Sequence, residues 1–175
     1  MDVCFSDDSL KQLMELSELR FGECHINKFD IHEYLLLINS SENNMREAER
    51  QLFNMAAIAF SDEKRGLHYQ GNGPKYFDII QMNIYAFLNG LEPYDKNKAT
   101  YVFIGASTIE YLTDSIFKQV GVGSSAVSLI VSLTLCLIIK ISIKSWCEFY
   151  SNRILTSPEL SQILKKIAGE GRDGR

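Results

Sequence analysis

The chain has 175 residues, of which 46% are hydrophobic and 23% charged, and its formal net charge is −4. This length suits one domain, or one domain plus a membrane anchor, and can bury a useful core. The charge is uneven, because residues 1–122 hold 11 Lys/Arg and 18 Asp/Glu whereas residues 123–175 hold 7 and 4. The acidic body argues against non-specific binding to nucleic acid, while the basic C-terminal part suits an anionic inner leaflet.

Helices are the main elements predicted before residue 60. An apolar stripe over residues 10–19 predicts a first helix. Asp30 and Glu33 have the spacing of a capping box in front of the segment YLLLI, which suits a second helix or a short strand. Ser41 is placed to cap a third helix. The apolar positions that would form the inner face of this third helix are Met45, Ala48, Leu52, Met55, Ala56 and Ala59.

The middle of the chain predicts a loop, two helices and one ambiguous segment. Residues 66–74, with three glycines and a proline, predict a loop before a helix over residues 77–88. Residues 100–104, TYVFI, suit a short strand or the lead-in to the next helix. Ser107 and Glu110 form a second capping box, which predicts a helix that continues to Val120. The glycines that follow it then predict a turn into the next segment, giving a helical hairpin.

The segment after this turn is the most apolar part of the chain. Residues 120–139 carry no charged side chain, and Trp146 and Tyr150 follow shortly after. A helix needs about 20 mostly apolar residues to cross a bilayer. As a membrane helix, the segment would place these two aromatic rings at the headgroup level, where such rings are enriched. The flanking Lys140 and Lys144 would extend their ammonium groups into the interface.

Small side chains recur every four residues along the same segment. They are Ser124, Ser128, Ser132 and Cys136. On a helix, such a strip lets a second helix approach closely in lipid, which predicts a homo-oligomer. Two other interpretations of the segment stay open. A helix that is apolar all round can also be the centre of a helical bundle, and the alternation of apolar residues at the odd positions from 127 to 143 has the period of a half-buried strand.

The hexapeptide from Arg20 to His25, RFGECH, provides the best candidate for catalysis. Its spacing resembles the R-x4-H motif of the HEPN ribonuclease family, whose Arg and His meet at a helical dimer interface to act on RNA. The resemblance implies that His25 moves a proton near neutral pH and that Arg20 stabilises the phosphate transition state. The alternative is an ordinary surface arginine beside a loop histidine.

No cofactor or metal signature is present in the sequence. Cys24, His25 and His32 offer zinc donors, but no second short-spaced pair of ligands completes a site. The segment from Gly71 to Lys75 lacks the length and ending of a P-loop. The four cysteines are expected to be free thiols in a reducing compartment.

The sequence therefore predicts an all-α, mainly helical protein in three parts. Residues 1–120 would be a cytoplasmic helical body that binds a protein partner, 121–150 a single membrane-spanning helix in contact with lipid, and 151–175 a short basic helix and tail. Ser157 and Pro158 predict the N-cap and first position of this last helix, which would continue to Ile167 before a frayed tail. We expect a non-enzymatic regulatory or effector module at the cell membrane that self-assembles and perturbs the bilayer. The basic residues after the span conflict with this orientation, because they favour a cytoplasmic C-terminus instead. The alternatives are a HEPN-like ribonuclease using Arg20 and His25, and a soluble adaptor with residues 124–146 as its core helix that binds another protein through a groove between amphipathic helices.

Overall fold

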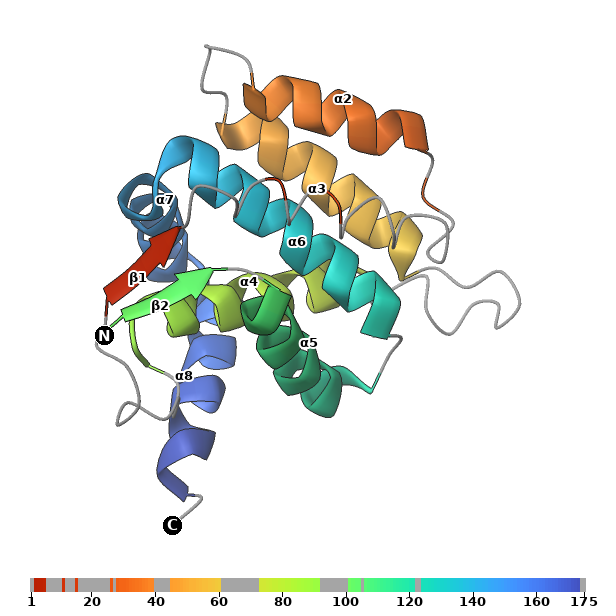
Figure 1. The fold of residues 1–175 in the computed structure, drawn as a ribbon. Helices are drawn as coiled ribbons and strands as arrows, with labels where there is room; N and C mark the ends of the chain where they lie inside the picture. Colours follow the sequence, from red (N-terminus) through yellow and green to blue (C-terminus); the bar gives the residue numbers. More distant parts are fainter. Residues whose placement is uncertain are drawn as a thin grey trace.

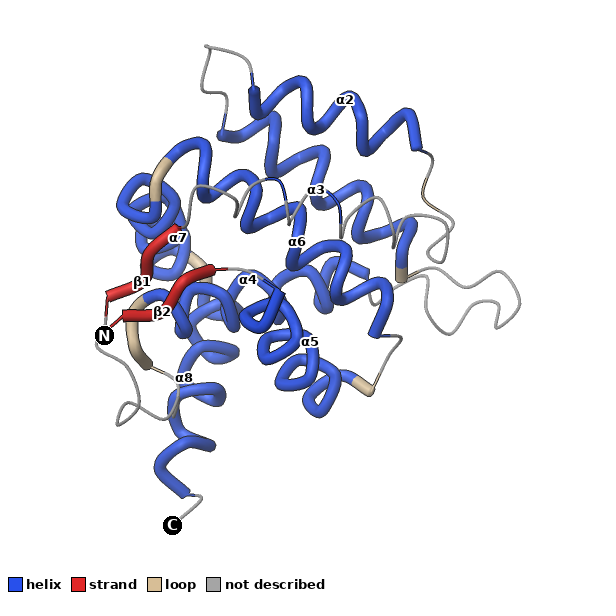
Figure 2. Tube along the Cα trace, in the orientation of Figure 1, coloured by secondary structure: helices blue, strands red, loops and turns tan. Residues whose placement is uncertain are grey.

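The computed structural model describes residues 2–5, 11, 15, 26, 28–39, 45–60, 73–91, 101–104, 106–121 and 124–173. This part of the chain is mainly helical, as expected (Figure 2). Its helices are α2 (Lys28–Asn39), α3 (Met45–Ala59), α4 (Gly73–Leu88), α5 (Ala106–Val120), α6 (Ser124–Ile141), α7 (Ile143–Thr156) and α8 (Pro158–Asp173). One small sheet joins β1 (Asp2–Phe5) to β2 (Tyr101–Ile104).

The centre of the fold is α6. It crosses the molecule beside α3, in the direction opposite to α3 (Figure 1), and α2 packs against both α3 and α6. Helices α4 and α5 also contact it. Every residue from Ala126 to Ile138 is buried. The interpretation of this segment as a core helix therefore describes the structure, and the interpretation as a strand was wrong.

The long helix expected over residues 124–146 is broken at Ser142. This residue adopts φ 91° and ψ 151°, and its hydroxyl oxygen accepts a hydrogen bond of 3.2 Å from the backbone N–H of Ser145. Its side chain thus caps the start of α7, in the manner of an N-cap serine. The axes of α6 and α7 consequently meet at an angle of 113°. Among the described residues, no single helix is long and apolar enough to cross a membrane, although α6 and α7 together have the length and composition of a broken span.

Several local predictions are confirmed. The inner face of α3 is buried at Ala48, Leu52, Met55 and Ala56. Helix α8 starts at Pro158 after Ser157, whose hydroxyl accepts from the Leu160 N–H at 3.3 Å. This helix extends to Asp173, into residues expected to form a frayed tail. The helix expected over residues 10–19 lies almost entirely outside the described residues.

Of the two strands in the sheet, the sequence indicated only the second. Residues 101–104 do form a strand, but its partner is the N-terminal segment, which pairs with it in parallel and in the register Asp2 to Tyr101. Ninety-odd residues separate the two strands in sequence, so no hairpin pattern could reveal the pairing. Both strands lie at the side of the helical body (Figure 1).

Several polar groups inside the core bond to neighbouring helices, whereas the buried atoms Gln81 Oε1 and Thr113 Oγ1 have no hydrogen-bond partner among the described residues. The Tyr34 hydroxyl of α2 donates to the Leu133 carbonyl of α6 at 2.8 Å. The Gln81 side chain of α4 donates to the Thr134 hydroxyl of α6 at 3.1 Å, and Thr134 donates to the Ile130 carbonyl at 2.8 Å. These bonds fix α6 to α2 and α4, because a buried polar group without a partner costs free energy. The hydrophobic core is continuous over α2–α8, so it draws side chains from all three expected parts of the chain.

Candidate functional site

A groove between α2 and α3 is the candidate site. Its volume is about 280 Å³, and it is lined by Asp30, Glu33, Arg50, Gln51, Asn54, Met55 and Ile58. The two helices are antiparallel neighbours at one side of the body (Figure 1). Met55 is buried and Ile58 is 41% exposed, so the groove combines apolar surface with polar walls. We refer to these seven residues as the α2–α3 groove.

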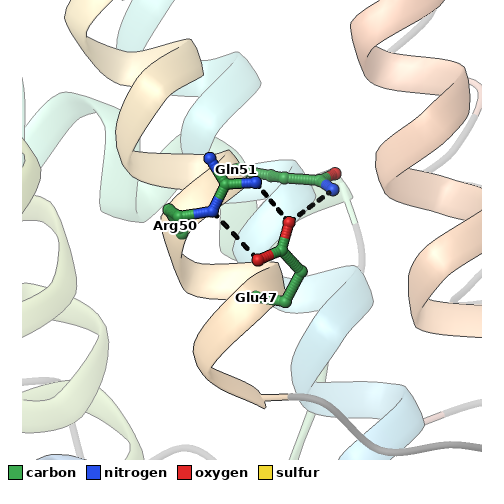
Figure 3. Close-up of polar contacts among 3 residues, drawn as sticks. All are labelled: Glu47, Arg50 and Gln51. Atoms are coloured by element: carbon green, nitrogen blue, oxygen red, sulfur yellow. Dashed lines mark hydrogen bonds and ion pairs between the residues drawn. The ribbon is translucent and has the colours of Figure 1, made fainter.

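The α3 wall is ordered by hydrogen bonds along one helix turn (Figure 3). Arg50 Nε donates to Glu47 Oε2 at 2.9 Å, and the second arm of its guanidinium pairs with Glu47 Oε1. Gln51 donates to the same carboxylate at 3.4 Å. The pairing lowers the pKa of Glu47, mainly through the hydrogen bond from Arg50. The positive charge of Arg50 is thus neutralised within α3.

The α2 wall carries the unbalanced charge. Asp30 lies in the first turn of α2, and Glu33 follows one turn later on the same side. Because α2 begins at Lys28, Asp30 is inside the helix rather than at its cap, contrary to the expected capping box. Among the described residues, no hydrogen bond or ion pair engages either carboxylate. The groove is therefore acidic on one side and amide-lined on the other.

The residues expected to mediate self-association are mostly inside the protein. Ser128, Ser132 and Cys136 are buried, and Ser132 donates to the Ser128 carbonyl at 2.7 Å. Burial raises the pKa of the Cys136 thiol to about 12, which keeps it protonated. Ser124 begins α6. Self-association through this strip stays a prediction, and it requires α6 to leave the core.

The four residues expected at a membrane interface divide into two pairs. Lys140 and Lys144 are exposed on either side of the break at Ser142. Trp146 and Tyr150 are buried, and their rings pack together with centroids 4.6 Å apart. Only the lysines are therefore available at the surface of this structure.

The expected catalytic and metal-binding residues contribute no described site. Arg20, Cys24 and His25 lie outside the described residues, so the ribonuclease resemblance stays a prediction. His32 is exposed on α2. Among the residues that the structure describes, no group of three or more His, Cys, Asp or Glu side chains is arranged to hold a metal ion. Cys136 and Cys147 are free thiols.

The sequence named a groove between amphipathic helices only in general terms. The spacing of Asp30 and Glu33 predicts the start of a helix, but it does not indicate that their carboxylates line a groove. Positions 50, 51, 54 and 58 fall on the outer side of the predicted α3 stripe, which is the signal that was available. No protein-family model, curated protein or solved structure matches this chain.

Proposed function

We propose that this chain is a non-enzymatic protein-binding module in which α6 is the core of a helical scaffold. The α2–α3 groove would bind a basic, partly apolar segment of a partner protein. The observation that carries the proposal is the groove itself, which places apolar Ile58 beside two carboxylates that no other described residue neutralises. Grooves between helices commonly accept amphipathic segments in this way.

The charge of the groove determines which partner fits. Asp30 and Glu33 attract a lysine or arginine, while Gln51 and Asn54 offer amide groups for hydrogen bonds. Ile58, which is 41% exposed, provides most of the surface for an apolar anchor, since Met55 is only 2% exposed. Residues 1–122 are acidic as a whole, which would also speed the approach of a basic partner.

The test uses a synthetic helical peptide of leucine and lysine. A helical peptide of leucine and glutamate, which has the opposite charge, serves as the control. Fluorescence anisotropy should show that the protein binds the lysine peptide but not the glutamate peptide. The double variant Asp30→Asn, Glu33→Gln should weaken binding of the lysine peptide severalfold. The double variant Glu110→Gln, Glu148→Gln removes two exposed carboxylates outside the groove and serves as the matched control. Equal weakening by both double variants would mean that only the overall charge attracts the peptide, and the groove would be rejected.

Methyl NMR locates the binding independently of charge. The Met55 methyl group lines the groove, whereas Met82 on α4 is fully buried elsewhere. Addition of the lysine peptide should shift the Met55 signal and leave the Met82 signal in place. Shifts of Met82 without Met55 would place the peptide elsewhere.

A second candidate function is the membrane effector expected from the sequence. It is favoured by the composition of α6 and α7, which together meet the length and apolarity of a span despite their bend. In this case α6 would leave the core, and the helices that cover it would open. Purified protein should then release a dye from anionic liposomes. A complete absence of release at every protein-to-lipid ratio would exclude the permeabilising form of this function.

A further inference from the structure

Charged side chains from four helices meet on the opposite side of α3 from the groove. Arg153 of α7 forms an ion pair with Glu49 of α3. Asp78 and Glu159 lie on α4 and α8, which pack against each other, and the charges of Glu159, Glu49 and Arg153 all act on Asp78. We call these four residues the Arg153 junction.

Arg153 contacts two aromatic rings as well as the Glu49 carboxylate. Its guanidinium carbon lies 4.6 Å from the centroid of the Phe149 ring and 5.9 Å from that of Tyr150. Its side chain is 45% exposed, whereas that of Glu49 is only 10% exposed. One carboxylate oxygen of Glu49, Oε2, is buried and has no hydrogen-bond partner. The ion pair therefore engages only one of the two carboxylate oxygens of Glu49.

The junction holds more negative than positive charge when all its groups are ionised. Three carboxylates share one guanidinium, since the charged groups that reach Asp78 are Glu159, Glu49 and Arg153. Burial, followed by repulsion from Glu159 and Glu49, raises the pKa of Asp78 to about 6, and Arg153 opposes this rise. Burial likewise raises the pKa of Glu49, despite the opposing effects of Arg153 and the Tyr150 hydroxyl. Burial and the Glu49 charge also raise the pKa of Tyr150, which therefore stays neutral.

We propose that the Arg153 junction is a proton-operated switch for the C-terminal helices. A proton taken up by Asp78 removes one of the repelling charges, so α7 and α8 pack more tightly against α3 and α4. Release of that proton near neutral pH restores the repulsion and loosens the same helices. Helix α8 would respond because Glu159 lies in its first turn, which packs against the body, while its C-terminal half extends away from the body (Figure 1).

The direction of the pH effect follows from the pKa of Asp78. Its value in the folded protein, about 6, lies above the ordinary value of 3.8, so folding favours the protonated form. The contribution to stability is complete below the ordinary value and is lost as the pH rises through about 6. The junction is therefore weaker at pH 7.5 than at pH 5, the reverse of the usual effect of a carboxylate in a salt bridge.

The single tryptophan of the chain provides a local probe. Trp146 is buried on α7 and packs on Tyr150, two helix turns from Arg153. In the full-length protein, acrylamide should quench its fluorescence more at pH 7.5 than at pH 5. Asp78→Asn keeps the shape of the side chain without its charge, so this variant should show the low quenching at both pH values. Its Tm at pH 7.5 should rise by about 2–4 °C, the shift that 1 kcal/mol produces in a chain of this size.

Two further variants complete the test. Asp114→Asn changes an exposed aspartate on α5 and should follow the wild type at every pH. Glu159→Gln removes a repelling charge from an exposed position, so it should reduce the pH dependence in part even if Asp78→Asn folds poorly. The proposal is overturned if Asp78→Asn and Glu159→Gln both keep the wild-type difference in Trp146 quenching between pH 5 and 7.5. Since none of these residues lines the α2–α3 groove, peptide binding tests the proposed function separately.

Discussion

The interior around α6 and the Arg153 junction hold the same helices together by different means. Around α6, residues 126–138 are buried without a charged side chain, and the hydroxyl groups of Ser132 and Thr134 donate to helix carbonyls. At the junction, one arginine serves three carboxylates, and a buried oxygen has no partner. The interior around α6 stabilises the fold at every pH, whereas the contribution of the Arg153 junction to stability depends on the protonation of its carboxylates. The difference shows that one small fold contains a fixed centre and an adjustable edge.

The two regions also differ in how they tolerate change. An apolar interior is closely packed, so the loss of a few methyl groups leaves a cavity. A cluster of partly exposed charges is screened by water and adapts through protonation. We therefore expect substitutions near α6 to reduce stability uniformly, and substitutions at the junction to change its dependence on pH.

The largest expected effect comes from truncation of a leucine on α6. Leu129 is fully buried, and Leu129→Ala should lower the free energy of unfolding by about 2–5 kcal/mol, because the transfer free energy is lost and a cavity remains. The same change at Leu155, which is 84% exposed on α7, should stay within about 0.5 kcal/mol. Urea unfolding followed by circular dichroism measures both. Similar values for the two variants would show that α6 is not covered by the rest of the chain.

The second largest effect is expected from the removal of Arg153, the one positively charged residue among the four of the Arg153 junction. Arg153→Ala leaves the Glu49 carboxylate buried without a counter-charge, and an unsatisfied buried group costs about 1–3 kcal/mol. The loss should be larger at pH 8 than at pH 5, since protonation of Asp78, whose pKa is about 6, lowers the negative charge that the arginine balances. Arg46→Ala, an exposed position on the same helix as Glu49, provides the control in the same urea titrations. A pH-independent loss at Arg153 would mean that its packing on Phe149 matters more than its charge.

The sequence predicted local features of the helices, but it could not predict what surrounds α6 or which charged residues meet at the Arg153 junction. The apolar period of α3 and the Ser157–Pro158 start of α8 were readable, because both depend on neighbouring residues. The surroundings of α6 were not, because lipid and a protein core are equally suited to leucine and isoleucine. The break at Ser142 carries no glycine or proline to reveal it. Glu49, Asp78, Arg153 and Glu159 come from four separate helices, so no spacing along the chain brings them together.

The smallest expected effect concerns the hydrogen bond between Tyr34 of α2 and the backbone of α6. Tyr34→Phe removes the hydroxyl that donates to the Leu133 carbonyl, which should cost about 0.5–1.5 kcal/mol. The value should be near the lower limit, because the phenylalanine ring fills the same space and the carbonyl lies within α6, where a backbone N–H also bonds it. Tyr76→Phe is the control, since this half-buried ring packs edge-on against Phe60 without a described bond to its hydroxyl. Both variants should keep the wild-type difference in Trp146 quenching between pH 5 and 7.5. If Tyr34→Phe changed that difference, the centre and the junction would be coupled through α3, and their separation into a fixed part and an adjustable part would be wrong.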